Sequence, residues 1–150
     1  MSADRGFIAR NDAERARLRA LVGGLADADL ARPMPAGWTV AAVLGHLAFW
    51  DQRMLVLLER LEQSPSHTLP AIREADVDWI NDAVKPFLLA MPPRQAAELT
   101  LATAEAVDAK VAALPDSALE RNEAMGRPLL MDRGEHRRAH LPEIERAVGR

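Results

Sequence analysis

The sequence predicts an all-α fold, a four-helix bundle with one long crossover connection. Apolar residues recur at spacings of three and four in the long segments between clusters of proline and glycine. No segment alternates apolar and polar residues with the period of two that half-buried strands show, and β-branched residues are sparse. The chain has 150 residues, of which 49% are hydrophobic, so it can bury a core without disulfides. We expect a single domain over residues 1–150, with the three tryptophans and six methionines in its core.

The first two helices follow from apolar spacing and from the breakers between them. The first is expected over residues 8–30, where Leu18 and Leu21 belong to a run with helical spacing. The second is expected over residues 39–61, because its apolar residues share one face at a period of 3.6. Thr39 is a candidate N-cap of that helix. The short proline-rich connection between the two helices favours antiparallel neighbours.

The second half of the chain predicts two more helical segments. One covers residues 76–114 with a break near Met91, where two prolines follow. The other covers residues 133–148, after an irregular stretch over residues 115–128. The connection over residues 63–75 is long. A dozen extended residues reach roughly 40 Å, enough to return along a helix and make the second and third helices parallel.

Charge and composition exclude several classes of function. Nineteen basic and 22 acidic residues give a net charge of −3. The chain therefore lacks the excess of positive charge that binding to nucleic acid or anionic lipid requires. Cysteine is absent, so disulfides, zinc–thiolate sites, iron–sulfur clusters and cysteine nucleophiles are excluded. The longest apolar-rich run, residues 39–50, falls short of the ~20 residues that span a membrane. The N-terminal segment has no apolar signal region, and we expect a cytoplasmic protein.

Two of the four histidines suggest a metal site. His136 and His140 are four residues apart, so a helix places both imidazoles on one face, where they can share an ion. The same stripe continues into Ile144 and is apolar, so the pair is expected on the buried face. The alternative is that each core histidine simply bonds to a backbone carbonyl. His67 lies in a proline-rich loop and is expected to be exposed.

His46 and Asp51 are the unusual residues of the second predicted helix. At about 100° per residue, His46 lies about 100° from Leu47, at the edge of the apolar face. With His136 and His140 it would complete a three-imidazole site for zinc, nickel or iron(II), with a position left for water or substrate. Alone, it would be a half-exposed boundary residue. Asp51 lies about 40° from Leu47, inside the apolar face. It is a candidate to orient a ligand histidine or to act as base, or else a buried partner of an arginine or a helix N-terminus.

Three stretches resemble the DinB/YfiT-like superfamily. WTVAAVLGHLAFWD resembles its second-helix signature, a Trp–Ser/Thr start followed by His–Leu and then an acidic residue. EHRRAHLPEI resembles its last-helix signature, two histidines four apart before an apolar residue. DVDWINDAV is similar to the third helix of these proteins and of the N-terminal domain of mycothiol-dependent maleylpyruvate isomerase. The resemblance extends over nearly the whole chain in order and spacing.

The resemblance implies a four-helix bundle with one long crossover, often dimeric, and a three-histidine metal site carried onto His46, His136 and His140. It also implies a low-molecular-weight thiol of the mycothiol or bacillithiol type. Our first hypothesis is a metal-dependent enzyme that acts on a small molecule by thiol transfer or hydrolysis, with Asp51 as the further catalytic candidate. The second is a non-catalytic small-molecule-binding or stress-protection protein. The third is a structural homodimer whose histidines only pack.

Overall fold

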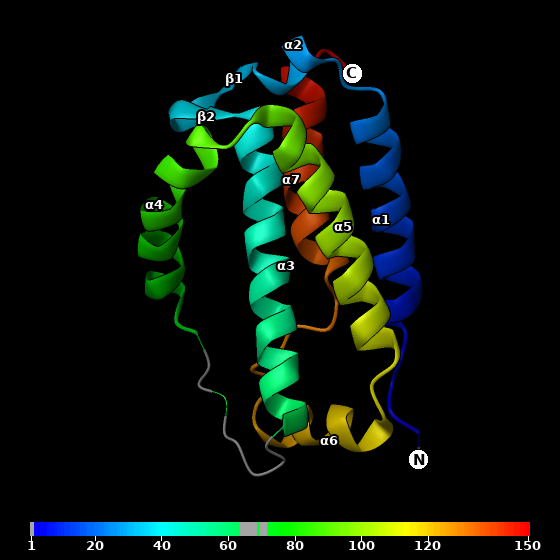
Figure 1. Cartoon of the computed structure of the whole chain (residues 1–150). Helices are drawn as coiled ribbons and strands as arrows, with labels where there is room; N and C mark the ends of the chain where they lie inside the picture. The colour runs from blue at the N-terminus through cyan, green and yellow to red at the C-terminus, as the bar shows by residue number, and fades with distance from the viewer. Residues whose placement is uncertain (1, 64–68, 70–71) are drawn as a thin grey trace.

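The computed structural model describes residues 2–63, 69 and 72–150, and these residues are mostly helical. Helices α1, α3, α5 and α7 lie side by side, and α4 lies outside α3 (Figure 1). The elements in chain order are α1 (Phe7–Gly23), α2 (Asp27–Leu30), β1 (Pro33–Met34), a 3-10 turn (Pro35–Gly37), β2 (Trp38–Thr39), α3 (Val40–Gln63), α4 (Glu74–Ala90), α5 (Pro93–Ala112), α6 (Asp116–Ala124) and α7 (Gly134–Ala147). The predicted all-α class is confirmed. Within the described residues, strand pairing is limited to the two-residue antiparallel pair β1–β2.

Helices α3 and α5 run in the same direction. Gly45, near the start of α3, lies against Ala96, near the start of α5. At the other ends, Lys110 Nζ of α5 lies 2.8 Å from a carboxylate oxygen of Glu62 in α3. Two consecutive core helices with this parallel arrangement need a long connection between them.

Helix α4 supplies most of that connection. The Trp50 indole N–H, midway along α3, donates to Asn81 Oδ1 in α4 at 2.9 Å. Helix α4 runs opposite to α3, so the third predicted segment divides near Met91 into an antiparallel half and a parallel half (Figure 1). The expectation that the second and third predicted helices are parallel is therefore wrong for α4 and right for α5, and α4 begins at Glu74, two residues earlier than predicted. Most of the connection over residues 63–75 lies outside the described residues.

Helix α1 lies parallel to α7 and antiparallel to α5. Arg17 of α1 pairs with Glu145 near the end of α7 at 3.0 Å. Arg15 of α1 reaches Asp108 late in α5 at 2.7 Å. The Arg17–Glu145 pair lies at the partly exposed edge of the first contact, whereas the Arg15–Asp108 pair reaches into the interior of the second. A partly exposed pair such as Arg17–Glu145 contributes modestly to stability but fixes which residues face one another.

Two predicted boundaries are corrected. Helix α1 ends at Gly23 and not at residue 30, because two consecutive glycines disfavour helix and Gly24 acts as C-cap. The stretch over residues 115–128 is not wholly irregular, since it contains α6. The Asp116 carboxylate in the first turn of α6 stabilises this helix by interacting with the positive end of the helix dipole.

Thr39 is confirmed as a cap of α3, since its Oγ1 accepts from the Ala42 N–H at 3.1 Å.

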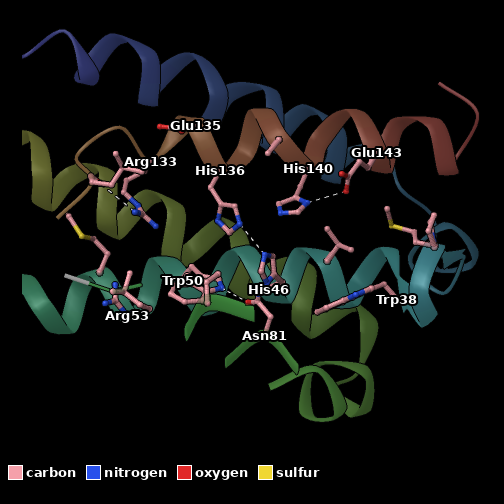
Figure 2. A pocket seen from close by; sticks show the side chains of 18 of the residues that line it. Trp38, His46, Trp50, Arg53, Asn81, Arg133, Glu135, His136, His140 and Glu143 are labelled. Atoms are coloured by element: carbon pink, nitrogen blue, oxygen red, sulfur yellow. Dashed lines mark hydrogen bonds and ion pairs between the residues drawn. The ribbon is translucent and has the colours of Figure 1, made fainter. Parts of the chain in front are cut away.

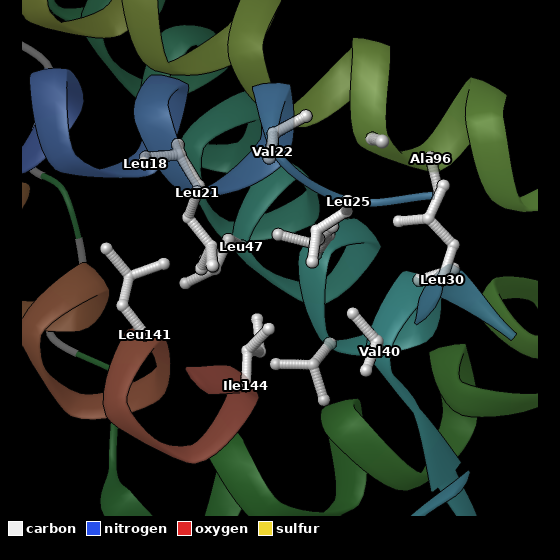
Figure 3. Packing of buried hydrophobic residues seen from close by; sticks show 14 of the residues in the cluster. Leu18, Leu21, Val22, Leu25, Leu30, Val40, Leu47, Ala96, Leu141 and Ile144 are labelled. Atoms are coloured by element: carbon white, nitrogen blue, oxygen red, sulfur yellow. The ribbon is translucent and has the colours of Figure 1, made fainter. Parts of the chain in front are cut away.

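The main hydrophobic core lies between α1, α3, α5 and α7 (Figure 3). Leu18, Leu44, Leu141 and Ile144 are each 0% exposed. Helix α3 is also the one described helix whose length and composition would let it cross a membrane, but 67% of its most apolar window is buried inside the fold. Burial of this kind is what a core helix shows.

Truncating the core at Leu44 is expected to cost about 2–5 kcal/mol of unfolding free energy, because the Leu44→Ala variant loses buried methyl groups and leaves a cavity. Val56, on the same helix and 39% exposed, provides the matched control. Val56→Ala should change stability by no more than about 0.5 kcal/mol. Urea unfolding of both variants checks this. Equal losses at the two positions would contradict the assignment of the core.

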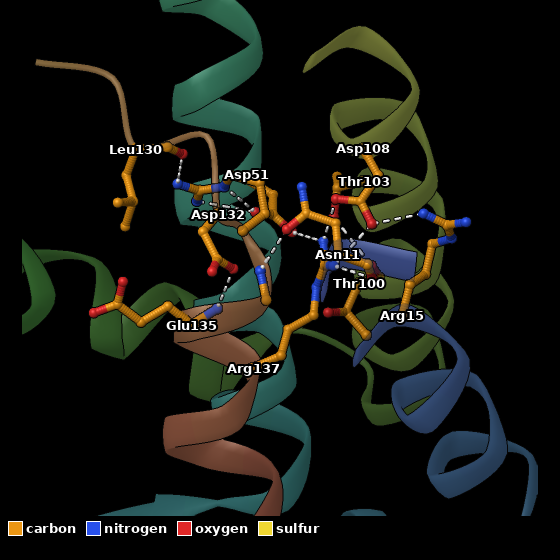
Figure 4. A network of polar contacts seen from close by, with 12 residues as sticks. Asn11, Arg15, Asp51, Thr100, Thr103, Asp108, Leu130, Asp132, Glu135 and Arg137 are labelled. Carbon is orange, nitrogen blue, oxygen red and sulfur yellow. Dashed lines mark hydrogen bonds and ion pairs between the residues drawn. The ribbon is translucent and has the colours of Figure 1, made fainter. Parts of the chain in front are cut away.

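A buried ionic network ties the four helices together (Figure 4). Arg137 of α7, 1% exposed, donates to both oxygens of Asp108 in α5 at 2.8 and 2.9 Å and to Asp51 of α3 at 3.3 Å. Arg15 of α1 also reaches Asp108, and Arg133 before α7 reaches Asp51 at 3.0 Å. Each buried carboxylate pairs with two arginines, so rotating α7 against α3 and α5 would separate buried opposite charges, which is costly.

Candidate metal centre

The structure brings the three predicted ligand histidines together. His46 comes from α3, and His136 and His140 come from successive turns of α7 (Figure 2). One nitrogen of each ring lies within 4.8 Å of the other two. The Nε2 atoms of His46 and His136 are 2.9 Å apart. The i, i+4 spacing places both α7 imidazoles on one face, toward α3, as predicted. That face is half-buried and not fully buried as expected, because the buried stripe of α7 passes through Arg137, Leu141 and Ile144.

The start of α7 is held firmly, which fixes where these imidazoles lie. The Gly134 N–H donates to Asn11 Oδ1 of α1 at 2.9 Å. The Asn11 amide in turn donates to the Met131 carbonyl at 2.9 Å. Together with the Arg133–Asp51 pair, these bonds anchor the last residues before the histidines to α1 and α3.

His46, which is buried, and His136, which is half-buried, are neutral near pH 7. Burial lowers the pKa of His46 to about 4, and the charge of His140 adds to the effect. Burial lowers the pKa of His136 to about 2, with further lowering by His46, His140, Arg133 and Arg137. Neutral imidazole is the form that binds a metal ion, so no proton has to leave these two rings at neutral pH.

The donor set fits a divalent ion. Zinc–imidazole bonds of about 2.0–2.1 Å in tetrahedral geometry place the nitrogens about 3.3 Å apart. The separation of 2.9 Å between His46 Nε2 and His136 Nε2, and the 4.8 Å limit for all three donors, bracket that value. Three imidazoles without a carboxylate or thiolate suit zinc, nickel or iron(II), and they leave at least one coordination position for another ligand.

Glu143 is a residue of the site that the sequence analysis missed. Its Oε2 lies 3.1 Å from His140 Nδ1. A carboxylate that accepts a hydrogen bond from Nδ1–H keeps the proton on Nδ1 and orients the ring. The lone pair of Nε2 is then available to bind a metal ion. The available signal was the spacing of three between His140 and Glu143, which brings two side chains together on a helix.

The Glu143→Ala variant is expected to bind zinc about 10-fold more weakly, the lower end of the effect for groups that orient ligand histidines, because Glu143 is half exposed. Competition with a chromophoric chelator measures this. Glu145→Ala is the control, since Glu145 pairs with Arg17 of α1 and not with a histidine. An equal loss of affinity in both variants would mean that Glu143 acts only through general charge.

Asp51 lies where the helical arithmetic placed it, but its partners are arginines. It is 3% exposed and pairs with Arg133 and Arg137, which is the arginine-partner alternative of the sequence analysis. Burial raises the pKa of Asp51, and the charges of the two arginines oppose that rise. Among the described residues, the hydrogen bonds and ion pairs of Asp51 are with these two arginines and not with a histidine. A role as base stays a prediction.

The histidines form part of the wall of a cavity of about 1040 Å³. Its lining includes Trp38 and Trp50, both half-buried, and Arg53 farther along α3. The expectation that all three tryptophans lie in the core is wrong, since Trp79 is 59% exposed on α4. His67 lies outside the described residues.

Comparison with known protein families gives a match that covers most of the chain. A family model described as the mycothiol maleylpyruvate isomerase N-terminal domain matches residues 12–145. No curated protein and no solved structure matches. The matched range contains all three histidines and extends from α1 into α7, in agreement with the resemblance drawn from the helix signatures. The chain therefore belongs to the mycothiol maleylpyruvate isomerase N-terminal domain family of the DinB-like superfamily.

Proposed function

We propose that the protein is a divalent-metal-dependent enzyme that acts on a small molecule by thiol transfer or hydrolysis. The observation that carries the proposal is the set of imidazoles on the wall of a large cavity, two of them neutral near pH 7. His46, His136 and His140 would hold the ion, which is zinc, nickel or iron(II). When bound, the ion would lower the pKa of a water or of a substrate thiol and so supply a nucleophile near neutral pH.

The chain's own residues support this chemistry by position. Glu143 keeps the His140 proton on Nδ1. The buried arginines hold α7 against α3, so the three donors stay together. The family's description points to a low-molecular-weight thiol such as mycothiol as a second cofactor.

We also propose that α1, α3, α5 and α7 form a four-helix bundle in which α4 carries the long crossover. The helix directions given by these pairs of contacting residues support this topology.

We further propose that the protein forms a homodimer in the cytoplasm. Light scattering coupled to size exclusion measures the oligomeric state, and a monomer would remove the dimer from the account.

A turnover screen tests the activity. Metal-loaded protein, metal-free protein and metal-treated His136→Ala protein are compared on thiol-transfer reactions with mycothiol or bacillithiol and on ester hydrolysis. We expect turnover with the loaded wild type alone. Equal turnover in the variant would assign the activity to something other than the three histidines.

The second candidate function is non-catalytic binding of a small molecule. The size of the cavity favours it, since about 1040 Å³ is at the upper end of ligand pockets. Mass spectrometry of the purified protein under native conditions distinguishes the two. A ligand that copurifies with metal-free protein supports binding, whereas bound metal without an organic ligand supports the enzyme.

A further inference from the structure

The cavity continues from the histidines along one face of α3. His46, Trp50 and Arg53 all line it and occupy positions i, i+4 and i+7 (Figure 2). Residues at this spacing share a helix face. At a rise of 1.5 Å per residue, Arg53 stands about 10 Å beyond His46 along the helix axis. The cavity therefore has a histidine end and a second, cationic end.

Arg53 is a cation without a carboxylate partner among the described residues. Its contact is with the Trp50 ring, whose centroid lies 5.5 Å from Cζ. The neighbouring Arg133, in contrast, is neutralised by Asp51 at 3.0 Å. Burial and the charge of Arg133 both lower the pKa of Arg53. A half-buried guanidinium beside another cation is stabilised when an anion arrives.

The other charged groups on the cavity wall do not supply that anion. The Glu143 carboxylate pairs with the His140 ring, whose Nδ1 lies 3.1 Å from Oε2. Glu135 is exposed on α7, and Figure 2 shows it on the α7 side of the view, across from Arg53 on α3. Arg146 is a further cation, toward the end of α7. The wall is thus short of negative charge near Arg53.

The wall between the two ends is apolar. Trp50 presents its ring, since its N–H is satisfied by Asn81 Oδ1 at 2.9 Å. Met54, Val77 and Leu130 line the cavity as well. A ligand that fills this stretch gains by removing apolar surface from water.

We propose that Arg53 binds the anionic group of an amphiphilic ligand, whose apolar chain of about 10 Å lies along Trp50 and whose other end reaches the three histidines. The chemical class is a carboxylate or phosphate monoester joined to an apolar chain. The proposal rests on the proposed function only for what happens at the histidine end. The anion site itself requires no metal, so the two can fail separately.

Calorimetric titration of metal-free protein with octanoate, octyl phosphate and 1-octanol tests the site. Wild-type protein is expected to bind an anionic probe about tenfold tighter than octanol, the fold-change for one charged hydrogen bond. In Arg53→Gln the ratio should fall to about one, and Arg53→Lys should retain part of the preference. Comparing octanoate with octyl phosphate decides between carboxylate and phosphate.

Two controls make the outcome decisive. Arg60→Gln alters an exposed arginine two turns farther along α3 and should leave the preference unchanged. The absence of metal from the titration is the second control, so failure of the metal site would not affect this result. Equal binding of anion and alcohol, an unchanged preference in Arg53→Gln, or no binding of any probe to the wild type would overturn the proposal.

Discussion

The His140→Ala variant is expected to lose tight binding of zinc. Two imidazoles would remain, and losing a ligand costs more affinity than the 10–100-fold typical for groups that only orient ligands. Zinc at about 100 times its dissociation constant should raise the unfolding free energy of the wild type by about 2.7 kcal/mol. At the same zinc concentration the variant should show almost no increase. Urea unfolding with and without zinc measures both.

His67→Ala is the matched control for this experiment. It removes the one histidine that the sequence analysis does not assign to the site, so zinc should stabilise it as it does the wild type. Full retention of zinc-dependent stabilisation in His140→Ala would contradict the assignment of His140 as a zinc ligand. Loss in both variants would point to nonspecific binding by histidines.

The Arg137→Ala variant is expected to lose about 3–5 kcal/mol of unfolding free energy, because removal of the guanidinium leaves buried carboxylates short of a partner. Asp108 would keep Arg15, and Asp51 would keep Arg133. A typical domain has only about 5–15 kcal/mol in total. Urea unfolding of metal-free protein gives the value without a contribution from the ion.

Arg138→Ala is the control for the network. Arg138 is the next residue of α7, half-exposed, and pairs with Asp132 at 3.1 Å. An exposed pair of this kind contributes about 0–1 kcal/mol. If Arg137→Ala costs no more than Arg138→Ala, the buried network does not hold the helices. Urea unfolding of the Arg137→Lys variant adds a check. We expect this variant to remain less stable than the wild type, because a lysine cannot make the two parallel hydrogen bonds to Asp108.

The helices and the three histidines could be predicted because both depend on local periodicity. Spacing of three and four fixes a helix face, and His136 and His140 share one by that rule alone. The same arithmetic placed Asp51 on the buried face of α3, where it is 3% exposed. These predictions need no knowledge of how one helix is rotated against another.

The partners across helices could not be predicted for the same reason. Arg137 stands beside two other charged residues in EHRRAH, a pattern typical of a solvated face, yet it is 1% exposed. Its partner Asp108 lies on α5, and the two side chains meet only because of how α7 is rotated against α5. Trp50 and Arg53 line the cavity together with Val77 and Asn81 of α4, which was predicted as a helix but not as one that packs antiparallel to α3.

The most direct test of the account is elemental analysis of protein purified without a histidine tag, for the wild type and for His136→Ala. Three imidazoles from two helices predict about one divalent ion per chain in the wild type and its loss in the variant. The same measurement is repeated after incubation with zinc, nickel and iron(II). Absence of metal from both proteins under all three conditions would contradict the metal centre and leave the histidines as packing residues.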